Sequence, residues 1–199
     1  MATDINLVIN NLLAFYDFSR KRIISVGSGG GQLASYGKVP ESILAVDHDQ
    51  QAIEQLKERV KALGLENKYE FLCGDYYQLK QKADAVLFEF CLHEMADAAK
   101  AIAKAVKMAK DIIVIDHALE SEWAYIVSEE EKVKKTWQAL EKFSIYTKQT
   151  YNTRHLFHDY RELYDKVAVQ GEITVKRIKK FRKARDFSIP FSYTLAWLR

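Results

Sequence analysis

The stretch Ile23-Ile24-Ser25-Val26-Gly27-Ser28-Gly29-Gly30-Gly31 decides the fold of this chain. Its first half is apolar and β-branched, which predicts a strand, and its second half is a glycine-rich turn followed by the helix-forming residues 32–35. Glycines let the backbone turn sharply and leave room for a ligand against the main chain. A strand, such a turn and a helix in this order predict a site for an adenosine-type cofactor.

A second apolar run, Ile43-Leu44-Ala45-Val46, ends in Asp47, twenty residues after Gly27. A carboxylate at the tip of the next strand can accept hydrogen bonds from both hydroxyls of a ribose. The glycine turn and the acid together suit several nucleotide-containing cofactors, including NAD. They predict a pocket for such a cofactor but do not identify which cofactor binds.

Short strands alternate with helices along the first 116 residues. Residues 4–20 have the apolar spacing of an amphipathic helix, with Asp4 as its N-cap. The predicted strands are 22–27, 42–47, 69–73, 83–90 and 111–116, and the predicted helices between them are 31–36, 49–63 and 96–108. This alternation predicts a parallel sheet with helices on both faces.

The remainder of the chain has a different pattern. Residues 119–143 and 154–168 are predicted to be helical, and Glu172–Lys183 and Phe187–Leu198 to be two long strands of a β-hairpin. We therefore expect one domain in four segments. They are an N-terminal helix (1–21), a cofactor-binding core (22–118), a helical insertion (119–168) and a closing β-hairpin (169–199).

Composition indicates an ordinary globular protein. The 199 residues are 48% apolar and 29% charged, with a net charge of +3. No window holds about 18 consecutive apolar residues, and the N-terminus lacks the plan of a signal peptide, so we expect a cytoplasmic protein without a membrane partner. Cys73 and Cys91 lie in or beside strand-like runs and are predicted to be buried, reduced thiols.

Taken in order, these features resemble the class I methyltransferases that use S-adenosylmethionine (SAM). The glycine turn matches the first motif of that family, Asp47 the second, Cys73-Gly74-Asp75-Tyr76 the third and the end of the fourth strand, residues 88–95, the fourth. The acid after the third strand and the terminal hairpin favour SAM over NAD. The resemblance implies a Rossmann-like α/β/α sandwich whose mostly parallel seven-stranded sheet includes one antiparallel hairpin strand.

The resemblance also implies roles for individual residues. Gly27, Gly29 and Gly31 would approach the amino acid part of SAM, Asp47 the ribose, His48 the adenine ring and Asp75 the adenine amino group. Neighbouring positions complete the predicted cofactor site: Ser28, Gly74, Glu89 and Phe90. Ser25 stands where the family usually has an acid, so Glu89 or the Phe90 carbonyl is expected to hold the methionine ammonium instead.

Candidate catalytic residues follow the fourth and fifth strands, because ligands of such sheets bind beyond the carboxyl ends of the strands. His93, Glu94 and His117 are the candidates for removing a proton from the acceptor. The alternative is that His93 packs or caps a helix and Glu94 is an N-terminal helix acid. Metal ligation by His93, Asp116 and His117, as in catechol methyltransferases, is not supported by spacing, so we assign no metal.

The acceptor is predicted to be a small molecule bound under the aromatic-rich insertion. There, His155 and His158 would share a helix face with Arg154 and Arg161. The basic run 176–185, with seven Lys and Arg residues, suggests an RNA methyltransferase as an alternative, although lysines also protect exposed edge strands. The sequence also fits a non-catalytic SAM-binding protein and, least well, an NAD-dependent oxidoreductase.

Overall fold

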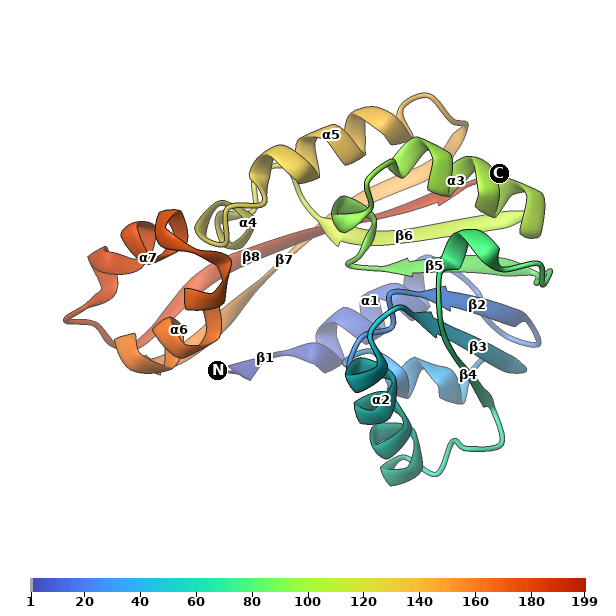
Figure 1. Ribbon diagram of the computed structural model, residues 1–199, viewed down its shortest axis with the longest axis horizontal. Coiled ribbons are helices and arrows are strands. Elements are labelled where there is room, and N and C mark those ends of the chain that lie inside the picture. Colours follow the sequence, from blue (N-terminus) through green and yellow to red (C-terminus); the bar gives the residue numbers. More distant parts are fainter. Residues whose placement is uncertain (1) are drawn as a thin grey trace.

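An eight-stranded sheet with helices on both faces forms the centre of the computed structural model, which describes residues 2–199 (Figure 1). The strands lie in the order β1-β7-β8-β6-β5-β2-β3-β4. They are β1 (Ala2–Thr3), β2 (Arg22–Val26), β3 (Ser42–Asp47), β4 (Tyr69–Cys73), β5 (Ala85–Glu89), β6 (Asp111–His117), β7 (Ile145–Asp159) and β8 (Arg185–Leu198). The helices are α1 (Ile5–Phe15), α2 (Gln50–Ala62), α3 (Ala98–Met108), α4 (Glu122–Ile126), α5 (Glu130–Leu140), α6 (Tyr160–Val167) and α7 (Glu172–Ile178).

Strands β2 to β6 pair in parallel, whereas β8 pairs antiparallel with both β6 and β7. Seven long strands with one antiparallel member confirm the Rossmann-like sheet, and the two-residue β1 adds an eighth strand at its edge. Figure 1 shows α1 and α2 on one face and α3 and α5 on the other. The parallel strands therefore end together at one edge of the sheet, where the site lies.

Burial on both faces explains why the central strands are almost entirely apolar. In β6, Ile113 and Ile115 pack into the core on the α1 side, whereas Ile112 and Val114 pack into the core under α3 and α5. The helices begin where their caps predict: Asp4 accepts a hydrogen bond from the Leu7 N–H (3.0 Å), and Asp49 caps α2. Predicted and observed elements agree closely up to residue 117, with two exceptions. The first helix ends at Phe15 and not at residue 20, and residues 31–36 form no α-helix, because a short 3₁₀ helix spans Ala34–Lys38.

The closing hairpin differs from its prediction. Its first strand is β7, residues 145–159, and not Glu172–Lys183, which instead contains α7 and a 3₁₀ turn. Buried Thr174 and Ile178 stand four residues apart, so one helical face meets the core. β7 pairs with β8 over almost the full length of both strands and so takes the place that the prediction gave to residues 172–183.

The predicted helix 154–168 is wrong over its first third, because those residues belong to β7 and α6 starts only after the N-cap Asp159. His155 and His158 consequently point to opposite faces of a strand, the first buried and the second exposed. The predicted insertion 119–168 thus contains a strand of the sheet, and a second helical segment, 160–184, connects β7 to β8. The basic run 176–185 lies mainly on that segment and not on an edge strand.

Both cysteines are free, as predicted, but neither is fully buried: Cys91 is partly exposed, and Cys73 is exposed. It ends β4, the edge strand of the sheet, where a side chain has fewer neighbours. Across residues 2–199, no helix combines the length and apolarity that a membrane span requires.

Candidate active site

The glycine turn after β2 is folded so tightly that its glycines are required. Gly27 has a φ of +70° and donates its N–H to the Val46 carbonyl at 2.9 Å. A Cβ at Gly27 would lie 2.2 Å from the Cβ of Cys91, so the segment after β5 packs directly on the turn. This contact brings the ends of β2 and β5 together.

Other glycines border open space. A Cβ at Gly29 would meet only the Gly27 carbonyl, at 3.9 Å, and a Cβ at Gly74 would meet nothing within 4 Å. Both residues therefore present bare backbone to the surface that a ligand would cover, the property that a cofactor cradle requires.

Asp47 at the tip of β3 is held by backbone donors. Its carboxylate oxygens accept hydrogen bonds from the N–H groups of Gly29 (2.9 Å) and Asp49 (3.1 Å). These bonds fix the carboxylate against the glycine turn and leave lone pairs for further donors. The next residue, His48, is almost fully exposed and lies 3.5 Å from Asp47 through its Nδ1.

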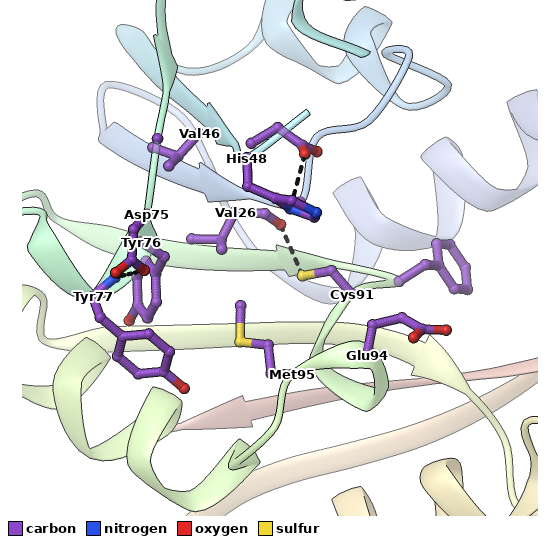
Figure 2. A pocket seen from close by; sticks show the side chains of 13 residues that line it. Val26, Val46, His48, Asp75, Tyr76, Tyr77, Cys91, Glu94 and Met95 are labelled. Carbon is purple, nitrogen blue, oxygen red and sulfur yellow. Dashed lines mark hydrogen bonds and ion pairs between the residues drawn. The ribbon is translucent and has the colours of Figure 1, made fainter. Parts of the chain in front are cut away.

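Two adjoining cavities of about 540 and 190 Å³ lie at this edge of the sheet and share Gly27 and Phe90 as lining residues. The larger lies over β3, β4 and the segment after β5. Figure 2 shows Val46 and His48 on one side of it and Glu94 and Met95 on the other. The smaller follows the glycine turn, with Glu89 in its wall. Their combined volume falls within the range of small-molecule sites, about 300–1,000 Å³.

Gly74 and Asp75 line the larger cavity, and Figure 2 shows Asp75 on the same side of it as Tyr76 and Tyr77. The Asp75 side chain caps the short helix Tyr76–Gln78 by accepting a hydrogen bond from the Tyr77 N–H at 2.8 Å. That bond orients the carboxylate at the cavity wall, beside the ring of Tyr77.

Glu89 lies next to the serine that replaces the usual acid. Ser25 on β2 donates a short hydrogen bond to the Glu89 carboxylate on β5, and Ser28 donates to Ser25 at 3.0 Å. The two strands are neighbours, and both side chains point to the same face of the sheet. Burial raises the pKa of Glu89 to about 7, although the Ser25 hydroxyl opposes this rise. The acid missing from position 25 is thus present one strand away.

Most of the residues predicted for the cofactor come together here. All but Gly31 of the ten line one of the two cavities, whereas Gly31 packs on α2, where a Cβ would be 2.6 Å from the Leu56 side chain. The cavities also have lining residues that the sequence did not single out: Val26, Gly30, Gln32, Leu33, Val46, Tyr76, Tyr77, Cys91 and Met95. Most of these are sequence neighbours of the predicted residues, which is the signal that could have found them.

A buried polar cluster lies behind Phe90. Asp116 at the end of β6 is fully buried and accepts from the His93 backbone N–H (3.1 Å) and the His117 backbone N–H (2.8 Å), and its Oδ1 is 2.5 Å from the His93 Nδ1. The rings of His93 and His117 lie 5.1 Å apart between centroids, and the ring of Phe90 lies 5.6 Å from that of His117. The predicted catalytic histidines are therefore neighbours.

Glu129 belongs to this cluster and could not be found from the sequence. It precedes α5, and Ser128 before it adopts a φ of +64°, which turns the chain so that Glu129 faces inward. Its Oε2 lies 3.4 Å from the His93 Nε2 and 3.6 Å from the His117 Nε2. No spacing in the sequence connects residue 129 with residues 93 and 117.

The pKa values of the two histidines in the cluster shift in opposite directions. Burial disfavours a charged His93 ring, but hydrogen bonds and charges from Asp116 and Glu129 outweigh it and raise its pKa to about 10. Burial lowers the pKa of His117 to about 4, partly opposed by Asp116. Glu94, half exposed, pairs with Lys132 at 2.8 Å, and this contact helps to lower its pKa.

Comparison with known proteins agrees with this fold. Residues 24–112 match the family model described as a methyltransferase domain. The chain resembles the crystal structure of a putative methyltransferase from Bacillus halodurans C-125, with 14% identity, 98% of each chain covered and a TM-score of 0.69. The comparison with curated proteins gave no match.

Two further solved structures are similar. A SAM-dependent methyltransferase from Aquifex aeolicus has 17% identity and a TM-score of 0.60, with 99% of this chain and 90% of that chain covered. Magnesium protoporphyrin IX methyltransferase from Synechocystis PCC 6803, solved with bound SAM, has 16% identity and a TM-score of 0.57, with 98% and 77% covered.

The sheet order and the glycine turn are those of the Rossmann-like methyltransferase fold. Residues 24–112 form a methyltransferase domain, and the chain as a whole has the fold of the solved SAM-dependent methyltransferases.

Proposed function

We propose that this enzyme transfers the methyl group of SAM to a small-molecule acceptor, and that SAM lies across the two adjoining cavities. The observation that carries this proposal is that both cavities meet at Gly27 and Phe90, with the polar cluster of His93 and His117 immediately behind Phe90. The adenosine part of SAM would occupy the larger cavity and its amino acid part the smaller one.

Bound SAM supplies an electrophilic methyl group on a sulfonium, so the protein must mainly align the reactants and exclude water. The Asp47 carboxylate is positioned to accept from the ribose hydroxyls, and Asp75 from the adenine amino group. Glu89 lines the smaller cavity and would receive the methionine ammonium, which takes over the role of the acid missing at Ser25.

The acceptor side is proposed to include His93, Glu94 and His117. Glu94 lines the larger cavity and lies 3.4 Å from the His93 Nε2, so it connects that cavity to the buried cluster. The cluster is almost closed to solvent on its other sides, because Asp116 and Glu129 are themselves buried. Of the three proposed residues, only Glu94 lines either of the two cavities, so a small acceptor bound there would contact Glu94 directly.

The basic run gives less support to RNA as the acceptor, because some of its charges are used inside the protein. Arg177 forms two bonds to the Glu130 carboxylate, at 2.6 and 3.0 Å, and stacks on the Tyr125 ring. Lys180 pairs with Glu122 at 2.9 Å. These contacts attach α7 to α4 and α5, which is a structural role.

Transfer from methyl-labelled SAM tests the acceptor class. The purified enzyme is incubated with a cell extract that has been separated into small-molecule, RNA and protein fractions. We expect label in the small-molecule fraction, and a reaction with Asp47→Ala enzyme at least tenfold slower. Label confined to RNA, or removed by ribonuclease, would contradict a small-molecule acceptor.

A further inference from the structure

Three buried side chains with metal-ligating atoms converge beside the proposed methyl-transfer site. One nitrogen each of His93 and His117 and one carboxylate oxygen of Glu129 all lie within 4.8 Å of one another. We propose that these three residues bind one divalent transition-metal ion, with Glu94 on the side of the cluster that faces the cavity.

The distances suit a metal centre. A tetrahedral ion with bonds of about 2.0–2.2 Å to nitrogen and oxygen holds its ligand atoms about 3.3–3.6 Å apart. The Glu129 Oε2 lies 3.4 Å from the His93 Nε2 and 3.6 Å from the His117 Nε2. The Glu94 Oε1 lies 3.4 Å from the same His93 nitrogen. The ligand atoms therefore need little movement to surround an ion.

Asp116 provides the support that metal-bound histidines usually have. A histidine ligand commonly directs its other ring nitrogen to a carboxylate, which fixes the tautomer and the orientation of the ring. The His93 Nδ1 lies 2.5 Å from Asp116, so its Nε2 is the nitrogen directed toward Glu129. Asp116 also accepts hydrogen bonds from the backbone N–H groups of both histidines, so it is a positioning residue for the whole cluster.

The charge of the cluster favours a divalent cation. Asp116 and Glu129 are two buried carboxylates, and in residues 2–199 the only cation of Lys or Arg type with an ion pair to the cluster is Lys132, which pairs with the outer residue Glu94. The protonated His93 ring compensates one of these carboxylates in the metal-free protein, and a buried carboxylate without a compensating charge is costly. One dication between two neutral imidazoles would balance the negative charges of both carboxylates.

The His117 ring is free to act as a ligand. Its Nδ1 is buried and has no hydrogen-bond partner in the described part of the chain, and its Nε2 lies 3.6 Å from the Glu129 Oε2. The Nε2 already faces Glu129, so it can bind an ion there with little movement of the ring.

Two imidazoles and a carboxylate form a ligand set typical of Zn²⁺ and neighbouring transition metals, not of Mg²⁺ or Ca²⁺. Three buried ligands leave a fourth position toward Glu94 and the cavity, the arrangement of catalytic zinc sites. If the proposed function holds, an acceptor with a thiol, hydroxyl or nitrogen donor would bind at this position, and coordination would favour loss of its proton.

Zinc binding to the purified full-length enzyme tests the proposal. After treatment with a chelator and its removal, the protein is titrated with Zn²⁺ by calorimetry, and the bound metal is measured by mass spectrometry. We expect one Zn²⁺ per chain, and an affinity reduced at least 100-fold in Glu129→Gln and in His117→Ala. The matched control is His158→Ala, an exposed histidine on β7, which should bind Zn²⁺ like the wild type.

S-adenosylhomocysteine (SAH) binding by each variant shows independently whether the fold and the cofactor site are intact. No Zn²⁺ binding by the wild type, or an equal affinity in Glu129→Gln and the wild type, would overturn the metal site while leaving the cofactor proposal standing. If His117→Ala does not fold, the isosteric Glu129→Gln decides. A wild type that binds Zn²⁺ but not SAH would instead contradict the proposed function alone.

Discussion

At the scale of single residues, the raised pKa of Glu89 makes a clear prediction about the pH dependence of stability. Its raised pKa, about 7 and caused mainly by burial, means that the folded protein holds this proton more tightly than the unfolded chain does. Its contribution to stability is therefore present below about pH 4.5 and is lost as the pH rises through about 7. Such a shift corresponds to about 2–3 kcal/mol between pH 5 and 8.

Urea unfolding of the ligand-free enzyme and of Glu89→Gln across this pH range measures the effect. We expect the free energy of unfolding of the wild type to fall relative to that of Glu89→Gln between pH 5 and 8. Parallel pH profiles of the two proteins would show that the carboxyl titrates normally.

Cofactor binding should have the opposite pH dependence. If the ammonium of SAH lies beside Glu89, binding favours the ionised carboxylate, so affinity should rise with pH up to about tenfold per unit below pH 7. Calorimetry from pH 5.5 to 8 checks this, and Glu89→Gln should bind weakly with little pH dependence. A wild-type affinity that does not change with pH would show that the SAH ammonium does not lie beside Glu89.

Substitutions of Gly27 and Gly74 separate the effect of a glycine on stability from its effect on cofactor binding. Gly27→Ala combines a positive φ with a Cβ placed on Cys91, and should lower the free energy of unfolding by at least about 2 kcal/mol. Gly74→Ala has open space around its Cβ, so its stability should stay within about 0.5 kcal/mol while SAH affinity falls, because the methyl enters the cavity. Urea unfolding and calorimetry separate the two effects, and equal losses of stability would contradict this explanation.

At the scale of elements, the sequence predicts the parallel core well and the last third poorly. Continuous apolar runs such as 111–116 belong to strands buried on both faces, and their boundaries are marked by caps and glycines. β7 is harder to recognise, because its sequence alternates Thr, Tyr, Lys and Gln, and its pairing with β8 depends on residues about 40 positions away. Long-range pairing overrides local propensity there.

The same limit applies to the site. The proposed cofactor residues follow predictable strand ends, so their positions could be inferred from motif order alone. Glu129 could not, because only the packing of α4 and α5 on the sheet brings it to His93 and His117.

The ion pair between Arg177 and Glu130 is one of the contacts that attach the helices between β7 and β8. Arg177 on α7 is four-fifths buried and binds Glu130 on α5 through two nitrogens. Arg177→Ala should lower the free energy of unfolding by about 1 kcal/mol, with Lys179→Ala, an exposed neighbour, as the control. Urea unfolding that shows equal effects for both would mean that this pair does not attach α7.

At the scale of the whole molecule, the cofactor should stabilise the fold, because its proposed site joins the ends of β2, β3, β4 and β5. A ligand at 100 times its dissociation constant adds about 2.7 kcal/mol, which raises the melting temperature of a chain of this size by about 5–10 °C. A thermal melt with and without SAH measures this, with adenosine as a weaker comparison ligand.

The most direct test of the cofactor site is calorimetric titration of SAH into the wild type, Asp47→Ala and, as control, Asp165→Ala, an exposed acid on α6. We predict one SAH per chain for the wild type and Asp165→Ala, and an affinity at least tenfold weaker for Asp47→Ala with unchanged circular dichroism. Absence of SAH binding by the wild type, or equal affinity in Asp47→Ala, would contradict the site.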